Sequence, residues 1–283
     1  MEGTIVKIIS NLYSVKAVDG IHECRARGKF RNDDITPVAG DKVIIDPVNN
    51  YILEIKNRRN ELKRPMVANI DACLIVSSLK RPTFSPFLLD KMITNVLLEG
   101  IEPIVVLSKY DLLTDTEKEE IKELIKYYNQ IGIKMILNTD TKTLYEYIDG
   151  KVLVLTGQTG VGKSTLLNNL DGSLNLATDD ISDALGRGKH TTRHVEFFQY
   201  KNALIADTPG FSALDIDENQ KENIRYTFKE FNNDGCKFRD CKHLKEVGCA
   251  VIEDVNNGKI LPSRYESYRR MVDDENHSFI FEK

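Results

Sequence analysis

The sequence has no tryptophan and only five cysteines among its 283 residues. An odd number this small cannot form the disulfide scaffold of so long a chain, so a disulfide-stabilised secreted fold is not expected. No run of about 18 apolar residues is present, which argues against a membrane-spanning helix. The first residues, MEGTIVKIIS, lack the long apolar core of a secretion signal. We therefore expect a cytoplasmic protein that does not associate with membranes.

The chain also has little net charge. Lysine and arginine number 39, and aspartate and glutamate number 43, which gives a formal net charge of −4. This balance excludes a uniformly basic protein that coats nucleic acid, but it permits a local basic patch. Hydrophobic residues make up 41% of the chain, so it can bury a core and is not largely disordered.

The hydrophobic pattern divides the chain into three regions, which we treat as three domains. Residues 1–64 contain five short β-type segments, which predicts an N-terminal β-barrel of the OB type; another five-stranded fold is the alternative. Residues 65–218 alternate apolar runs with amphipathic helices, which is typical of an α/β domain with a mostly parallel sheet. Residues 219–283 are polar and helical and contain three of the five cysteines.

Single elements can be assigned within the α/β region. A helix is expected from Ser85-Pro86 to about Glu99, because proline is favoured at the first helical position. A second helix is expected to begin after a cap at Thr114 or Asp115. Buried strands are expected at residues 71–78, 102–108, 134–138, 151–156 and 203–207.

The segment GQTGVGKS, residues 157–164, matches the phosphate-binding pattern G-x-x-x-x-G-K-[ST]. It follows an expected strand and precedes an expected helix, as the motif requires. Its glycines let backbone N–H groups surround a polyphosphate, and the helix N-terminus adds its dipole. Lys163 is expected to reach the β- and γ-phosphates, and Ser164 to ligate Mg²⁺. The predicted phosphate-binding residues are Gly157, Gln158, Thr159, Gly160, Val161, Gly162, Lys163, Ser164 and Thr165.

Two downstream segments fit the same site. Asp207-Thr208-Pro209-Gly210 follows an expected strand, so that Asp207 can approach the Mg²⁺ and the N–H of Gly210 can approach a γ-phosphate. Residues 186–192, GRGKHTT, are polar and aperiodic. A threonine in this stretch can complete the Mg²⁺ shell when a γ-phosphate is bound, which would make the segment a switch. A loop with incidental threonines is the alternative.

Ser108-Lys109-Tyr110-Asp111 follows the strand at 102–108 and is similar to the guanine-reading N-K-x-D motif. A carboxylate at Asp111 can accept hydrogen bonds from N1–H and the 2-amino group of guanine, whereas adenine offers neither donor. Lys109 can lie over the base or ribose. The first position is serine instead of asparagine, which puts the usual contacts of that asparagine in doubt.

The order of the motifs is itself informative. The base-reading motif precedes the phosphate loop, whereas in ordinary GTPases it follows the loop. This order predicts a circular permutation, which a fold tolerates because its termini and surface loops can exchange roles. The segment after Asp207 then leads directly into the C-terminal region.

The C-terminal region contains a cluster of potential metal ligands. Three cysteines and one histidine follow the spacing C-x4-C-x-H-x5-C: Cys236, Cys241, His243 and Cys249. Three thiolates and an imidazole form the ligand set of a closed, structural Zn²⁺ site, because no coordination position is left open for chemistry. Redox-active or incidental thiols are the alternative.

The N-terminal region contains a basic stretch, CRARGKFR at residues 24–31. In an extended strand its four cations would share one face, and such a stripe can follow an RNA backbone. A solvated strand face is the alternative. The predicted RNA-binding residues are Arg25, Arg27, Lys29 and Arg31.

Together these motifs resemble the circularly permuted GTPases of the RsgA type, and the resemblance covers nearly the whole chain. It implies a bacterial, monomeric GTPase that binds the 30S ribosomal subunit and its 16S rRNA late in assembly. Hydrolysis of GTP to GDP and phosphate would be stimulated by the subunit, with Mg²⁺ bound beside GTP and one structural Zn²⁺. By position, Thr192 is the switch threonine. His190 is the residue that orients water, since Phe211 stands where many GTPases have glutamine.

Two other functions remain compatible with the residues. One is a P-loop ATPase or small-molecule kinase, because Ser108 departs from the guanine motif. The other is an RNA-binding module that senses a nucleotide without appreciable hydrolysis, because Phe211 cannot hydrogen-bond a water molecule.

Overall fold

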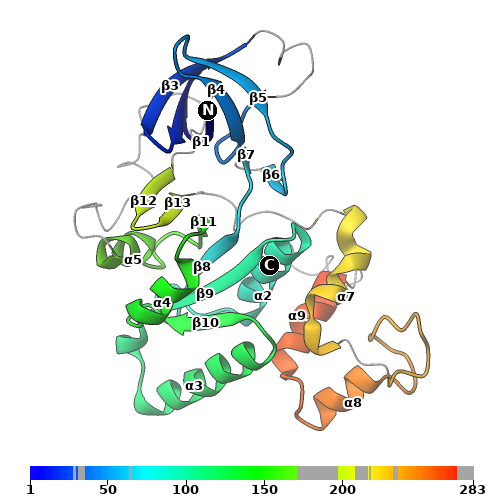
Figure 1. The fold of residues 1–283 in the computed structure, drawn as a ribbon. Helices are drawn as coiled ribbons and strands as arrows, with labels where there is room; N and C mark the ends of the chain where they lie inside the picture. The colour runs from blue at the N-terminus through cyan, green and yellow to red at the C-terminus, as the bar shows by residue number, and fades with distance from the viewer. Residues whose placement is uncertain are drawn as a thin grey trace, which may run out of the picture.

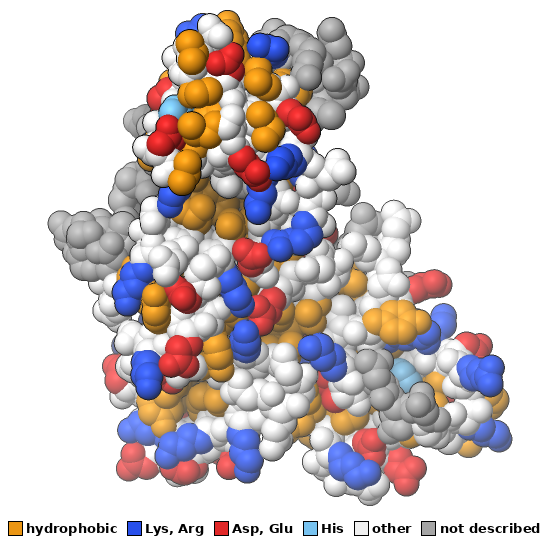
Figure 2. All heavy atoms as spheres, viewed as in Figure 1, with side chains coloured by type: hydrophobic (Ala, Val, Ile, Leu, Met, Phe, Trp, Pro, Cys, Tyr) orange, Lys and Arg blue, Asp and Glu red, His pale blue; other side chains and the backbone are white. Residues whose placement is uncertain are grey.

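The computed structural model describes residues 1–27, 30, 36–63, 66–170, 197–207, 216, 218–231 and 235–272. Figure 1 shows a β-barrel at one end, an α/β domain in the middle and a small helical region beside it. Basic and acidic side chains are interspersed over the face seen in Figure 2, as the small net charge of −4 would suggest.

The N-terminal barrel is closed, with strand order β1-β2-β3-β5-β4. Its interior is apolar because alternate side chains of each strand point inward, among them Ile5, Val15, Cys24 and Ile52. The predicted five-stranded β-barrel is therefore confirmed. The strands are β1 (Glu2–Ile9), β2 (Leu12–Ala17), β3 (Gly20–Ala26), β4 (Lys42–Asp46) and β5 (Tyr51–Ile55).

The basic stretch does not form one extended strand, so that prediction is wrong. Strand β3 ends at Ala26, and the backbone N–H of Phe30 turns back to donate to the carbonyl of Arg27 at 3.2 Å. The cause is the burial of Phe30, whose side chain is only 6% exposed and packs in the barrel core. Arg25 and Arg27 are exposed at this end of the barrel, whereas Lys29 and Arg31 lie outside the described residues.

The central sheet has six strands in the order β10-β9-β8-β11-β13-β12. The first five are parallel, and β12 pairs antiparallel with β13 at one edge. All five predicted strands are confirmed, but β12 was not predicted. The strands are β8 (Ala72–Ser78), β9 (Glu102–Ser108), β10 (Lys134–Leu137), β11 (Val152–Thr156), β12 (Phe197–Tyr200) and β13 (Ala203–Asp207).

Helices cover both faces of this sheet. Helices α2 (Pro86–Leu98) and α3 (Asp115–Gln130) pack on one face, and α4 (Thr141–Ile148) and α5 (Lys163–Leu170) on the other. The hydroxyl of Ser85 caps α2, and Thr114 and Glu117 form a capping box at the start of α3, so both predicted helix starts are confirmed. No helix in the described ranges combines the length and the apolar character needed to cross a membrane.

The barrel rests directly on the sheet. A hairpin of β6 (Glu61–Lys63) and β7 (Met66–Ala68) leads from the barrel into β8. Val6 of β1 and Phe197 of β12 are buried in the same apolar cluster. Nearby, Lys16 Nζ donates to Gln199 Oε1 at 2.5 Å. Edge strand β12 is therefore the part of the sheet that meets the barrel.

The C-terminal region has a separate apolar core, which includes Phe228, Phe231 and Tyr268. It packs on the α/β domain mainly through contacts of α9 with α2. Its elements are the 3-10 helix η4 (Glu218–Asn223), helix α7 (Ile224–Thr227), the 3-10 helix η5 (Lys229–Phe231), and helices α8 (Ala250–Asn256) and α9 (Pro262–Val272).

Buried charges connect α9 to the α/β domain. Arg264 of α9 is only 1% exposed, and Asp90 of α2 is fully buried. Arg264 Nη1 donates to Asp90 Oδ1 at 2.5 Å, and Arg264 Nε donates to Glu230 Oε1 at 2.7 Å. The hydroxyl of Tyr128 in α3 donates to the same Asp90 oxygen at 2.7 Å. Each buried charge thus has an opposite partner, as burial requires. We call these four residues the Arg264 cluster.

Candidate nucleotide site and metal cluster

The predicted nucleotide motifs lie at one edge of the central sheet. Strands β8, β9, β11 and β13 are parallel, so their carboxyl ends meet at the same edge. Strand β9 ends at Ser108 and residues 109–111 follow it, residues 157–162 follow β11, and β13 ends at Asp207. Ligands of open α/β sheets bind just beyond this edge. The topology thus brings together motifs that are far apart in the sequence.

The phosphate loop begins with a glycine that no other residue could replace. Gly157 has a φ of +147°, and a Cβ built there would lie 2.3 Å from the carbonyl oxygen of Val76. A side chain would therefore clash with the backbone of neighbouring strand β8. Farther along the loop, the side chain of Val161 is 2% exposed and packs in the core beneath the sheet. The loop is anchored at both points.

A lysine and a serine occupy the start of α5, directly after the loop. Lys163 Nζ donates to the carbonyl oxygens of Gly157 at 2.8 Å and of Gln158 at 2.9 Å. Its ammonium group therefore lies against the loop, at the positive end of the helix dipole, where an anion would be stabilised. Ser164 is buried in the first turn of α5, and the adjacent Thr165 is exposed.

The last residue of β9 and the residue after it are hydrogen-bonded to the phosphate loop. The hydroxyl of Ser108 donates to the carbonyl of Val161 at 2.5 Å. Lys109 Nζ donates to the carbonyl of Gly160 at 2.7 Å. The serine that replaces asparagine therefore still links the two motifs. The structure brings Ser108 and Lys109 together with the loop into a single site.

The structure describes some of the other residues predicted for this site and leaves three of them outside its described ranges. Tyr110 packs against the apolar core, and Asp111 is exposed in the 3-10 helix η1 (Tyr110–Leu112). The backbone of Asp207 pairs with Leu155 of β11, which places it beside the start of the loop. Three predicted residues lie outside the described part of the chain: His190, Thr192 and Gly210.

Two residues near the site were not predicted. The hydroxyl of Thr156, directly before the loop, is buried without a hydrogen-bond partner among the described residues. The carbonyl of Arg81 accepts a hydrogen bond from Lys109 Nζ. Their positions at or just after the ends of β11 and β8 were the only signal in the sequence, since neither belongs to a motif.

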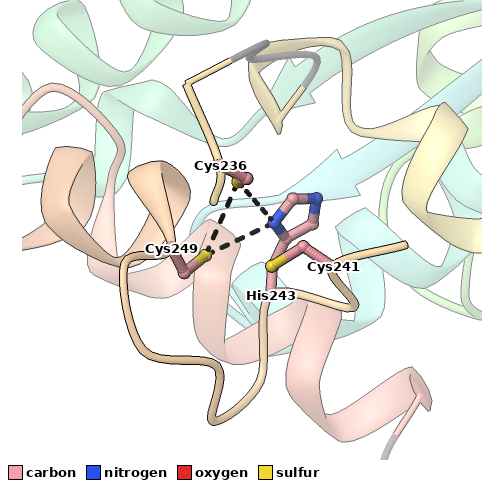
Figure 3. Close-up of side chains that lie close together, drawn as sticks. All are labelled: Cys236, Cys241, His243 and Cys249. Carbon is pink, nitrogen blue, oxygen red and sulfur yellow. Dashed lines mark hydrogen bonds between the residues drawn. The ribbon is translucent and has the colours of Figure 1, made fainter. Parts of the chain in front are cut away.

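The predicted metal ligands converge in the C-terminal region. Their ligand atoms all lie within 4.8 Å of one another, and Figure 3 shows the four side chains pointing toward one another. Cys236 Sγ lies 3.6 Å from His243 Nδ1 and 4.0 Å from Cys249 Sγ, and His243 Nδ1 lies 3.4 Å from Cys249 Sγ. Cys241 is buried beside them. The cluster could hold a metal ion, and its composition is compatible with zinc.

The surroundings of this cluster also suit a metal ion. Burial lowers the pKa of His243, which favours the neutral imidazole that a metal needs. Burial also raises the pKa of Cys241 to about 12, so ionising this thiol requires a nearby cation. Tyr265 donates to the carbonyl of His243 at 2.8 Å, and Tyr268 to that of Lys242 at 2.6 Å, which fixes the loop that carries the ligands.

Two family models match the chain: the RsgA N-terminal domain at residues 2–52 and the RsgA GTPase at residues 55–217. A protein of Halalkalibacterium halodurans named small ribosomal subunit biogenesis GTPase RsgA is 46% identical, with 94% of each chain covered. A protein of the same name from Enterococcus faecalis is 43% identical, covering 100% of this chain and 98% of its own.

Solved structures give the same result. YloQ, described as a circularly permuted GTPase, matches with a TM-score of 0.80 and 35% identity, covering 96% of this chain and 93% of its own. YjeQ from Thermotoga maritima matches with a TM-score of 0.81 and 31% identity, covering 96% of each chain. The chain therefore belongs to the RsgA GTPase family, with its motifs in circularly permuted order, and it is an enzyme that hydrolyses GTP.

Proposed function

We propose that this GTPase binds the small (30S) ribosomal subunit and assists its late maturation in the cytoplasm, with GTP turnover stimulated by the subunit. The names of its relatives, small ribosomal subunit biogenesis GTPases, support the assignment to the subunit. The observation that carries the proposal within this chain is the contact of Ser108 and Lys109 with the phosphate loop. This contact joins a base-reading motif to a triphosphate cradle, as a GTP switch requires.

In this proposal, the nucleotide is held from both ends. The carboxylate of Asp111 accepts hydrogen bonds from guanine, and the aliphatic part of Lys109 covers the base. The N–H groups of the loop bind the phosphates, while Lys163 neutralises the charge that develops on them. The hydroxyls of Ser164 and Thr192 would hold Mg²⁺, which would supply positive charge to stabilise the phosphates.

The attacking water needs a group that can both donate and accept hydrogen bonds. Phe211 cannot do so, and His190 is the residue to which we assign this role. The segment that contains His190 and Thr192 precedes β12, and the segment 207–210 begins at the last residue of β13. Both predicted switch segments therefore flank the β12–β13 pair, against which the barrel packs.

We propose three domains with distinct tasks. The barrel, residues 1–64, contacts 16S rRNA through Arg25 and Arg27, and Lys29 and Arg31 extend the same basic stretch. Residues 65–218 bind and hydrolyse GTP. Residues 219–283 form the zinc-binding domain. The enzyme acts as a monomer.

The metal of the C-terminal cluster is proposed to be Zn²⁺ with a structural role. A tetrahedral Zn²⁺ with bonds of about 2.3 Å to sulfur and about 2.0 Å to nitrogen places two sulfurs about 3.8 Å apart, and a sulfur and a nitrogen about 3.5 Å apart. The observed separations are 4.0 Å between sulfurs, and 3.6 and 3.4 Å between sulfur and nitrogen. The thiols of Cys236 and Cys249 and the imidazole of His243 therefore match the spacing of this ion, and Cys241 Sγ lies within 4.8 Å of each of them.

The test is to measure GTP turnover with and without purified small ribosomal subunits, and the displacement of labelled GDP by GTP and by ATP. We expect turnover to rise with subunit concentration and GTP to displace GDP far better than ATP. Large ribosomal subunits serve as the control. Equal turnover with either subunit would refute the assignment to the small subunit, and equal displacement by ATP would refute the role of Asp111.

A further inference from the structure

A cleft opens at one end of the barrel, between the turn that joins β1 to β2 and the end of β3. Its volume is about 860 Å³, within the range of about 300–1,000 Å³ that is usual for small-molecule sites. It is separate from the nucleotide site and from the metal cluster. The cleft has the size of a site for one nucleotide or a similar small group, and is too small to enclose a double helix.

Part of the cleft lining is apolar. Ile9 and Leu12, which line it, are large hydrophobic residues, yet they are 53% and 39% exposed. Tyr13 and Phe30 also line the cleft, and both are buried in the barrel core. The apolar lining is therefore continuous with the interior of the barrel. Such a surface is stabilised when a planar apolar group covers it.

The rest of the lining includes cationic and polar side chains. Arg25 and Arg27 line the cleft and are exposed, and the guanidinium of Arg27 lies 5.9 Å from the centre of the Tyr51 ring. A guanidinium group binds phosphate through two parallel hydrogen bonds and also stacks on planar rings. Asn11, at the tip of the turn, supplies an amide with a donor and an acceptor side by side.

We propose that this cleft binds one unpaired nucleotide of a single-stranded RNA segment. The base lies against Ile9 and Leu12, its polar edge meets Asn11, and its phosphate meets Arg25 and Arg27. A nucleotide has these three parts, namely a planar apolar face, a hydrogen-bonding edge and an anion. In a duplex the face is stacked and the edge is paired, so only unpaired RNA can enter. The inference rests on the proposed function, because it specifies which feature of ribosomal RNA the barrel recognises.

The test compares a short unstructured RNA with the same strand annealed to its complement. Both are labelled with fluorescein, and their binding to the full chain is measured by fluorescence anisotropy at one fixed salt concentration. We expect the single strand to bind at least about five-fold more tightly, since stacking of one base is worth this much or more. The variants Leu12→Ser and Arg27→Gln should each weaken single-strand binding by at least about five-fold.

The matched control is Lys56→Gln, which removes an exposed cation of the same barrel that pairs with Glu2 and does not line the cleft. It should leave RNA binding nearly unchanged. Thermal melting of each variant checks that the barrel is folded. In addition, RNA that contains 4-thiouridine should form photocrosslinks to residues 9–13 or 25–27.

Several results would overturn the inference: duplex binding as tight as single-strand binding, equal effects of Lys56→Gln and Arg27→Gln, crosslinks confined to other regions, or no RNA binding at all. Turnover of the wild-type enzyme with small subunits is measured in parallel. If stimulation is present without a preference for single strands, only this inference fails, and if stimulation is absent, the proposed function fails.

Discussion

The Arg264 cluster permits a quantitative prediction about how the C-terminal region is held to the GTPase domain. Replacing Arg264 by methionine keeps most of its volume but removes the cation that Asp90 and Glu230 share. Burial raises the pKa of Asp90, and Arg264 partly offsets this rise. Without Arg264, a fully buried carboxyl group loses its only cationic partner in the cluster. Breaking a buried pair in this way costs about 3–5 kcal/mol.

The assay is thermal unfolding of the full chain, monitored by differential scanning fluorimetry. For a unit of about 150–250 residues, a loss of 1 kcal/mol lowers Tm by about 2–4 °C, so Arg264→Met should lower Tm by about 6–20 °C. The matched control is Lys259→Gln, which removes an exposed cation that pairs with the partly buried Asp254 and should cost less than about 1 kcal/mol. Similar shifts for the two variants would show that the buried cluster has no special role.

A triple variant distinguishes the loss of the ion pair from the free-energy cost of leaving a buried charge without a partner. When Asp90→Leu and Glu230→Gln are added to Arg264→Met, the buried carboxylates disappear with the cation. Replacing a buried pair by apolar groups is often close to neutral, so the triple variant should recover part of the lost Tm. If it is less stable than Arg264→Met alone, the reasoning from desolvation is wrong.

Four further predictions concern the sites. Lys163→Ala should abolish measurable GDP binding by calorimetry, because its ammonium lies against the phosphate loop where it can neutralise the bound phosphates. Ser108→Ala leaves a buried carbonyl of Val161 without its donor, so GDP affinity should fall by about ten-fold in a fluorescent-nucleotide assay; an unchanged affinity would mean that this link is dispensable. His190→Ala should keep GDP binding but lose most subunit-stimulated turnover, and stimulation at the wild-type level would exclude its role. A zinc chelator should increase hydrogen exchange at residues 235–256 while the strands of the central sheet stay protected.

The sequence predicted those features that a short local pattern determines. The phosphate loop was identified because a glycine is required where a Cβ would strike the backbone of β8, and the lysine and serine follow at fixed positions. The start of α2 was identified because Pro86 stands at its first position, and the start of α3 because Thr114 caps it within the same turn. The metal cluster followed from its ligand types and spacing.

Features that depend on distant residues were missed. Strand β12 has only four residues, and its pairing with β13 defines it. The basic stretch was assigned to one strand because its alternation suggested a period of two, but the burial of Phe30 in the barrel turns the chain after Ala26. The link from Ser108 to Val161 joins residues 53 positions apart, so no local pattern encodes it.

The packing of the barrel against edge strand β12 suggests a way to measure which nucleotide the enzyme has bound. The pair β12–β13 lies between the two predicted switch segments in the sequence, and β12 shares an apolar core with β1. We therefore expect that displacement of either strand end would tilt the barrel. A donor dye on the exposed Val48 and an acceptor dye on α8 would register this tilt. Energy transfer between these dyes would then follow the change from GTP to GDP in real time, in solution and before any ribosome is added.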